Sequence, residues 1–532
     1  MTKTLFIGLD GATFTVLNEM TRDLPDCGVT MPFLKQFMET GAQAKLFSTP
    51  NPLTPPAWVS IMTGRTPGNH GVYDFIRAEE KGNEVYFTLS DSRDIRSETI
   101  WSIASRQNRT VAALNFPLTA PPRSIAGSLV PGFVPWKHLR RNTTPRDLYD
   151  RLKEIPDFDP KELAWDFDRE KQLYEAMTEE EIENWIRYHI PREEQWFRIA
   201  EKLLREDQPD LMAVLFDGVD KLQHQAWVFL DPALLPSNPS PWQKRMREIC
   251  IGYFRKLDTY IEKLVELVGP EAQVFMASDH GFTASTEVVR INAFLAEKGY
   301  VTWKETDDSP AAKRREASTF AYLDWEKTLA YCRTPSSNGI TIRVAQNPGD
   351  PGIKPEEYET FREKLIEDLK SLKDENTGEP ILRAIHKRED VFPGGAMNEA
   401  PDLTLVLRDY GFVSIKNTQP VVEPREVASG THHPDGIFLA GGYGIKSGMK
   451  GERQNIVDVP ATLIYSLGLA IPEDLEGKVA ENFFTTECLK STPVVIKATT
   501  LLEKDTKEEV ENISDDEKDK ILAQLQMLGY ME

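Results

Sequence analysis

Residues 211–218 read LMAVLFDG, six apolar residues in succession followed by an aspartate and a glycine. An uninterrupted apolar run of this length is typical of a strand that is buried on both faces of a parallel sheet. Residues 274–277, VFMA, have the same character. Because segments with helical periodicity separate such runs, the sequence predicts an α/β fold with a doubly wound, mostly parallel sheet between helices. Further apolar or β-branched runs at 4–9, 111–115, 402–407 and 436–440 are expected to belong to this core.

The composition is that of a folded globular protein, and it excludes some classes of partner. Of 532 residues, 40% are apolar and 28% are charged; 63 Lys and Arg against 84 Asp and Glu give a net charge of −21. A surface this acidic repels a phosphate backbone, so nucleic acid is excluded as a bulk partner. No stretch approaches the roughly 18 consecutive apolar residues that a membrane span needs. The sequence therefore predicts no membrane partner.

The cysteines and the N-terminus bear on the compartment. Four cysteines lie far apart without CxxC spacing, which fits free thiols in a reducing compartment. Asp10 breaks the first apolar run before that run could serve as the core of a signal peptide. We therefore expect a cytoplasmic protein.

Acidic and histidine side chains stand where the predicted strands end. Asp10 follows the first run, Asp217 follows the run at 211–216, and Asp279 and His280 follow the run at 273–277. In open α/β sheets, ligands bind outside the carboxyl ends of the strands, so these side chains are expected to converge on one crevice. Each Asp-Gly pair alone is equally typical of a turn or a helix cap. The hypothesis of a site depends on the whole set.

Two more segments add metal-ligand types to this set. Asp220 and His224 are spaced i, i+4, which places both on one face of a helical turn, and His432 precedes the run at 436–440. Asp217 and His433 are the alternatives to Asp220 and His432. Three carboxylates and three imidazoles would hold two divalent ions, Zn²⁺ by default or Mn²⁺ because of the oxygen ligands.

Thr54 is the candidate nucleophile. It precedes two prolines at the start of a segment with helical character, so it is also a good helix N-cap with Pro55 at the first helical position. The two interpretations are compatible, because a helix N-terminus favours a phosphate group. Metal coordination would lower the pKa of the hydroxyl and make it an attacking alkoxide.

Together these residues resemble the alkaline phosphatase superfamily, most closely its type I phosphodiesterase and nucleotide pyrophosphatase branch. The resemblance covers about residues 1–75, 210–285 and 400–480, and it depends on five ordered motifs: GLDG at 8–11, Thr54 with TGRTPGNHG at 63–71, DKLQH at 220–224, SDHG at 278–281 and GTH at 430–432. It implies that one metal ion is held by Asp10, Thr54, Asp279 and His280, and a second by Asp220, His224 and His432. It further implies a covalent phospho-threonine at Thr54 that water then hydrolyses.

Two departures from the branch concern the substrate. The nucleotide pyrophosphatases carry a phosphate-binding asparagine at the position of Phe75, and Pro55 and Pro56 supply no backbone N–H beside the nucleophile. We therefore expect phosphoester hydrolysis of a small molecule, by a phosphodiesterase or nucleotide pyrophosphatase-like enzyme. A phosphomonoesterase or phosphomutase is the alternative on the same fold, and a non-enzymatic scaffold stapled by metals is a further one. A sulfatase is disfavoured, because no modifiable Cys or Ser stands in the place of Thr54.

The chain is expected to divide into core segments and insertions. Residues 136–206 are charged and helical with four tryptophans, and residues 300–400 are polar and rich in turn signals. Both insertions are expected to carry substrate specificity. The predicted order is a core with the nucleophile (1–135), a helical cap insertion (136–206), a core with metal ligands (207–299), a second insertion (300–400), core completion (401–488) and an acidic C-terminal tail and helix (489–532).

Overall fold

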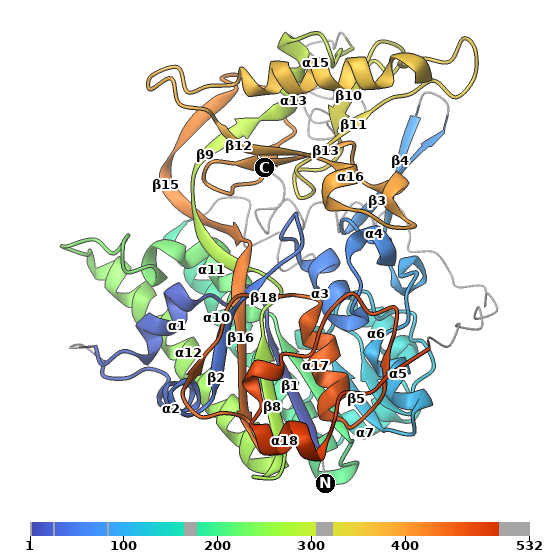
Figure 1. Ribbon diagram of the computed structural model, residues 1–532. Coiled ribbons are helices and arrows are strands. Elements are labelled where there is room, and N and C mark those ends of the chain that lie inside the picture. Colours follow the sequence, from blue (N-terminus) through green and yellow to red (C-terminus); the bar gives the residue numbers. More distant parts are fainter. Residues whose placement is uncertain (1–2, 25–26, 82–83, 164–177, 305–322, 499–532) are drawn as a thin grey trace.

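A central sheet organises the computed structural model, which describes residues 3–24, 27–81, 84–163, 178–304 and 323–498. Within these residues the sheet has nine strands (Figure 1). Their order is β17 (Met449–Lys450), β2 (Ala42–Phe47), β16 (Asp435–Gly442), β8 (Gln273–Ala277), β1 (Thr4–Leu9), β7 (Leu211–Phe216), β5 (Val111–Leu114) and β6 (Gly127–Val130), and β18 (Gln454–Asn455) pairs with β2.

The centre of the sheet is parallel, as the apolar runs predict. Strand β1 pairs in parallel with β7 on one side and β8 on the other, and every residue of these three strands is buried. Strand β16 runs antiparallel between β8 and β2. Alternate residues of β1 enter different clusters: Leu5, Ile7 and Leu9 pack on one face, and Phe6 packs on the other with Trp58. The predicted fold, a mostly parallel sheet between two helical layers, is confirmed.

Much of the predicted cap contributes to one of these layers. Its described part comprises α6 (Trp136–Asn142), α7 (Leu148–Leu152), α8 (Pro160–Leu163) and α10 (Glu179–Glu206). Helix α10 contacts β7 and the long α12 (Pro241–Val268). Trp185 and Trp196 are buried in the same apolar cluster as β1, whereas Trp136 is partly exposed. The two buried rings therefore pack the core, and Trp165 lies outside the described residues.

The second insertion forms a separate small sheet above the central one (Figure 1). Its antiparallel strands have the order β10 (Ala330–Cys332), β11 (Gly339–Ile342), β13 (Leu403–Leu407) and β12 (Leu382–Lys387). With α13 (Ile291–Glu297) and α15 (Tyr358–Lys370) they enclose their own apolar cluster. The run at 402–407, expected in the core sheet, lies in this second sheet instead. A purely apolar run predicts a buried strand, but it does not indicate the sheet to which that strand belongs.

Two long paired strands link the second sheet to the core. They are β9 (Gly281–Arg290), which directly follows the site residues 279–280, and β15 (Val422–His433), which is antiparallel to β9. Helix α17 (Asp458–Ser466) packs in the apolar cluster that contains Phe6, and α18 (Thr486–Ser491) and β20 (Ile496–Lys497) follow it. The acidic tail and helix expected at 489–532 lie outside the described residues from 499 on. Among the described helices, none has the length and apolar character to cross a bilayer.

Candidate active site

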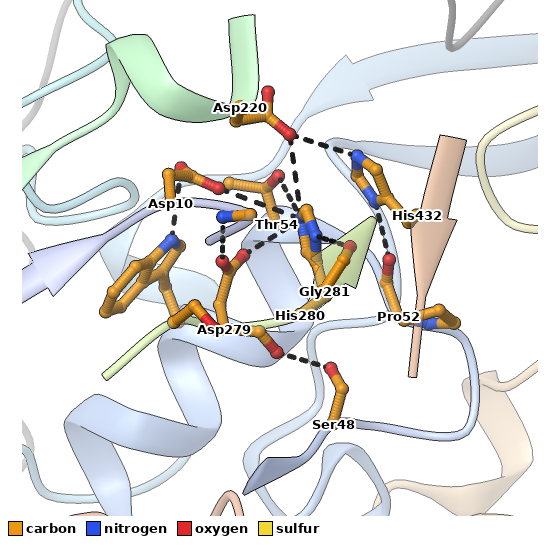
Figure 2. Close-up of polar contacts among 12 residues, drawn as sticks. Asp10, Ser48, Pro52, Thr54, Asp220, Asp279, His280, Gly281 and His432 are labelled. Carbon is orange, nitrogen blue, oxygen red and sulfur yellow. Dashed lines mark hydrogen bonds and ion pairs between the residues drawn. The ribbon is translucent and has the colours of Figure 1, made fainter. Parts of the chain in front are cut away.

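The fold brings all seven predicted site residues together at the carboxyl edge of the central strands. Figure 2 labels all of them except His224. Asp10 follows β1 and Asp279 follows β8, so parallel pairing of these strands sets the two carboxylates side by side. Thr54 begins α3 (Thr54–Thr63), and α11 (Gly218–Leu230) presents two more of the residues after β7. All seven are buried: Asp10, Thr54, Asp220, His224, Asp279, His280 and His432.

His280 is the centre of the first group. Its Nε2 atom lies 3.2 Å from Asp279 Oδ2, 3.7 Å from Asp10 Oδ1 and 3.4 Å from Thr54 Oγ1. One ligand-type atom from each of Asp10, Asp279 and His280 falls within 4.8 Å of the others. This is the spacing at which one divalent ion could contact all of them.

Asp220 is the centre of the second group. Its Oδ1 atom lies 3.2 Å from His432 Nε2, 3.5 Å from His224 Nε2 and 3.9 Å from His280 Nε2. The Nε2 atoms of His224 and His432 are themselves only 3.1 Å apart. His280 thus faces both groups, which adjoin one another.

Backbone carbonyls assign the protons of the three imidazoles. The Nδ1 atoms of His224, His280 and His432 lie 3.2, 3.1 and 2.6 Å from the carbonyl oxygens of Gly430, Gly281 and Pro52, respectively. A carbonyl oxygen only accepts hydrogen bonds, so each Nδ1 donates, and in a neutral ring the lone pair then lies on Nε2. The three Nε2 atoms point toward carboxylate oxygens, and in their neutral form these rings fit a cation there.

Burial gives the carboxylates unusual proton affinities. Burial, with the neighbouring carboxylates, raises the pKa of Asp10 and Asp279 well above the ordinary range. Burial alone would raise the pKa of Asp220, but His224 and His432 hold it well below its ordinary value. The pKa of His280 is lowered, first by burial and then by His432, so this ring is neutral. A divalent ion would keep these crowded, buried carboxylates ionised by compensating their charge.

Neighbouring donors fix the outer oxygens of two carboxylates. Trp58 Nε1 donates to Asp10 Oδ2 at 3.2 Å, and the Gly11 N–H donates to Asp279 Oδ1 at 3.1 Å. Asp10 Oδ1 and Asp279 Oδ2, which face His280, accept no hydrogen bond from the described residues. The residues present therefore fit a metal ion in this group. Sequence analysis missed Trp58, although its i+4 spacing from Thr54 on a helix places both on one face.

Thr54 is not the cap of its helix. The N-cap is Leu53, with extended backbone, and no side chain caps this end. Thr54 is the first helical residue and its hydroxyl lies near His280 instead. The capping interpretation is therefore wrong by one residue, a common error at helix ends. This placement sets the hydroxyl beside His280 in the site instead of at a helix cap.

The two alternative ligands lie outside the groups. Asp217 is buried in an ion-pair network with Arg192 at 3.1 Å and Lys221 at 2.9 Å. Burial would raise the pKa of Asp217, but the two cations lower it to about 2. His433 Nδ1 accepts from the Asp435 N–H at 3.0 Å, and its ring packs on Tyr410. Neighbouring residues on a strand point to opposite faces, which explains why His432 and not His433 faces Asp220.

We expect Arg192→Met to destabilise the protein by about 3 kcal/mol, because removing one of the two cations that pair with the buried Asp217 leaves part of its charge without compensation. Arg192 and Asp217 are both buried. The control is Arg187→Met on the same helix, where an exposed ion pair with Glu183 predicts a change within about 0.5 kcal/mol. Urea unfolding measures both. Equal effects would mean that the Arg192–Asp217 pair adds nothing beyond an exposed pair.

Asp74 joins the core to the second insertion beside Phe75. Its carboxylate accepts from the Phe75 N–H at 2.6 Å, from Ser336 Oγ at 2.9 Å and from Thr334 Oγ1. Burial raises the pKa of Asp74 to about 6, against the effect of these hydrogen bonds. The Phe75 side chain is buried in the core cluster, so it offers no donor in place of the expected asparagine.

Asp74 therefore predicts a pH dependence of stability. Its native pKa exceeds the ordinary 3.8, so the native state binds this proton more tightly, and the resulting stabilisation is lost as pH rises through about 6. Between pH 5 and pH 8, the free energy of unfolding of the wild type should fall by about 1–2 kcal/mol relative to that of Asp74→Asn, because only the wild type has this carboxyl group. Urea unfolding across this range measures the difference. Parallel pH profiles for the two proteins would contradict the expectation.

Comparison with known proteins gives a family and a fold. The model of one protein family, described as type I phosphodiesterase / nucleotide pyrophosphatase, matches residues 4–435. Human ectonucleotide pyrophosphatase / phosphodiesterase 5 has a similar structure, with 15% identity, 92% of this chain and 99% of that chain covered, and a TM-score of 0.50. Murine ectonucleotide pyrophosphatase / phosphodiesterase 5 is similar as well, with 14% identity, 91% of this chain and 100% of that chain covered, and a TM-score of 0.50. No curated protein sequence matches.

Proposed function

Because the chain belongs to the type I phosphodiesterase / nucleotide pyrophosphatase family of metal-dependent hydrolases, we propose that it cleaves small phosphoesters with two metal ions and a phospho-threonine at Thr54. One observation carries the proposal. The Thr54 hydroxyl lies 3.4 Å from His280 Nε2, the atom that faces both groups of carboxylates and imidazoles. A buried threonine hydroxyl in such surroundings supports a nucleophile rather than a structural role.

The donor set decides which ions suit the two groups. We propose that Asp10, Thr54, Asp279 and His280 hold one ion and that Asp220, His224 and His432 hold the other. Mixed nitrogen and oxygen ligands favour Zn²⁺ and admit Mn²⁺. When bound, such ions lower the pKa of an alcohol and compensate negative charge on phosphoryl oxygens.

In the proposed reaction, residues of the chain provide the nucleophile and hold the metal ligands in place. Thr54 Oγ1 gives its proton to solvent and attacks phosphorus, and the bond from phosphorus to the leaving oxygen breaks, with the leaving oxygen keeping the electron pair. Water then cleaves the bond between phosphorus and Thr54 Oγ1 and restores the hydroxyl. Trp58 and the Gly11 N–H hold Asp10 and Asp279 in place, so the carboxylates need not reorganise during the reaction. The N-terminus of α3 adds a favourable dipole, although Pro55 and Pro56 contribute no N–H.

Phosphomonoester hydrolysis or phosphoryl transfer remains the second candidate. It is favoured by Phe75, whose buried ring takes the place of the phosphate-binding asparagine that nucleotide pyrophosphatases carry. A site without that donor has one contact fewer for the phosphate of a diester.

Metal content and two aryl substrates together test the proposal. We expect two metal ions per chain and faster turnover of bis(p-nitrophenyl) phosphate than of p-nitrophenyl phosphate. Faster turnover of the monoester would favour the second candidate. Bound metal without turnover of either compound would favour a metal-stapled scaffold and contradict both.

A further inference from the structure

A cavity of about 780 Å³ lies between the core and the second insertion. One wall comes from the chain after α4 (Pro67–His70), which continues into β3 (Ile76–Lys81). The other wall comes from residues 333–346 and 398–402 of the insertion. Figure 1 shows α4 and β3 beside α16 (Arg388–Val391) of the insertion. The volume suits a small organic ligand, and none of the seven site residues lines it.

Arginine dominates the charge of this cavity. Among its described lining residues, five are arginines and three carry carboxylates, in a chain whose net charge is −21. The arginines are Arg77, Arg96, Arg333, Arg343 and Arg388, and the carboxylates are Asp74, Glu399 and Asp402. Guanidinium groups match carboxylate and phosphate in geometry and charge. A wall rich in arginine in an acidic protein would attract anions of this kind.

The carboxylates of the wall are engaged in holding it together. Asp402 accepts from Tyr358 Oη at 2.5 Å and from the Ile342 N–H at 2.7 Å, and it pairs with Arg388 at 3.1 Å. Glu399 pairs with Arg96 across the boundary between the core and the insertion. These acids therefore fix the shape of the cavity rather than repel a ligand from its centre.

Hydrogen bonds connect the cavity wall to the loop that carries the nucleophile. Ser336 donates through its hydroxyl to Asp74, which lines the cavity, and its backbone carbonyl accepts from Asn51 Nδ2 at 2.8 Å. Asn51 is three residues before Thr54, so the Cα atoms of the two are at most about 11 Å apart. The cavity wall and the nucleophile loop are therefore held in a fixed relation to each other.

We infer that this cavity binds a second anionic group, a phosphate or carboxylate, on the non-reacting part of the substrate. The inference rests on the proposed function and narrows the substrate to phosphoesters with at least one further negative charge. Contacts to a remote charged group orient the reacting group at the nucleophile, so they should raise kcat/KM.

Two substrates that differ by one phosphate test the inference. They are the p-nitrophenyl ester of thymidine 5′-phosphate and the same compound with a 3′-phosphate; release of p-nitrophenol is followed for both. Charge-assisted hydrogen bonds to the extra phosphate predict that kcat/KM is higher for the 3′-phosphorylated compound by roughly tenfold or more. The comparison uses the full chain with its metals.

Single arginine variants locate the effect. Arg77→Gln and Arg333→Gln, on opposite walls, should each reduce the preference by roughly tenfold and leave kcat/KM on the compound without the 3′-phosphate nearly unchanged. Arg77 is 48% exposed and pairs with Asp94 at 2.8 Å. Arg187→Gln is the matched control, since Arg187 is 52% exposed, pairs with Glu183 at 2.8 Å and lies on α10, outside the cavity. This control should keep the full preference.

The outcomes separate the inference from the proposed function. Equal kcat/KM of the wild type on the two compounds, or equal losses on both in the cavity variants, would overturn the inference and leave the proposed function standing. A metal-loaded wild type that turns over neither compound would overturn the proposed function and the inference with it. Loss of the preference in Arg187→Gln as well would also overturn the inference.

Discussion

Thr54→Ala should reduce turnover of bis(p-nitrophenyl) phosphate by at least about 10³-fold, because the variant lacks the oxygen that would attack phosphorus. The cost in stability should be at most about 1 kcal/mol, since Thr54 follows the N-cap residue and does not cap α3. Initial rates and urea unfolding on the same preparations give both quantities. Thr54→Ser should retain measurable activity, because a primary alcohol can occupy the same position.

Thr63→Ala is the matched control for this experiment. Thr63 is a buried threonine at the other end of α3, and its hydroxyl donates to the Val59 carbonyl at 2.7 Å. Its loss should lower stability and leave turnover within a few-fold of the wild type. Normal turnover in Thr54→Ala would show that the hydroxyl is not the nucleophile, whatever the two stabilities are.

Removal of the metal ions should abolish turnover, and Zn²⁺ or Mn²⁺ should restore it. The reason is the charge of the site: Asp10, Asp279 and Asp220 are buried close together and would lose their compensating charge. We also expect a lower midpoint of thermal unfolding for the chelated protein, because an ion that binds only the native state stabilises it. Full activity in protein shown to be metal-free would contradict the two-metal proposal.

Two adjacent histidines provide the residue-level test of the metal site. His432→Ala should lower metal content and reduce turnover by at least about 100-fold, since even residues that only support metal ligands contribute 10–100-fold. His433→Ala should leave both nearly unchanged, because its ring packs on Tyr410 away from Asp220. The same result for both variants would mean that His432 has been assigned the wrong role.

The sequence alone predicts those parts of the fold that follow from local patterns, such as apolar runs and helical spacing. Runs such as 211–216 are apolar because both faces of the strand are covered, and the polar residues that follow them lie at the sheet edge for a topological reason. The i+4 spacing of Asp220 and His224 likewise follows from one helical turn. The convergence of seven side chains could therefore be predicted from strand ends and spacing, together with the family resemblance.

Other features depend on long-range pairing that one sequence does not encode visibly. The run at 402–407 is as apolar as a core strand, and only its pairing with β11 and β12 places it in the second sheet. Trp185 and Trp196 could have lined a substrate site, until α10 was seen to pack on β7 and α12. The cavity between the core and the second insertion is lined by residues more than 300 positions apart, such as Arg77 and Arg388. No local sequence pattern could therefore predict it.

The loop before Thr54 is anchored at three points within five residues. Ser48 Oγ donates to the Asp279 carbonyl at 2.5 Å, Asn51 Nδ2 donates to the Ser336 carbonyl at 2.8 Å, and the Pro52 carbonyl accepts from His432 Nδ1 at 2.6 Å. Each anchor belongs to a different part of the chain: the end of β8, the second insertion and β15. The loop therefore fixes the distance from Thr54 to both groups of ligand residues. An insertion of even one residue would change that distance. Engineering of this enzyme should therefore vary the cavity and keep the loop at its native length.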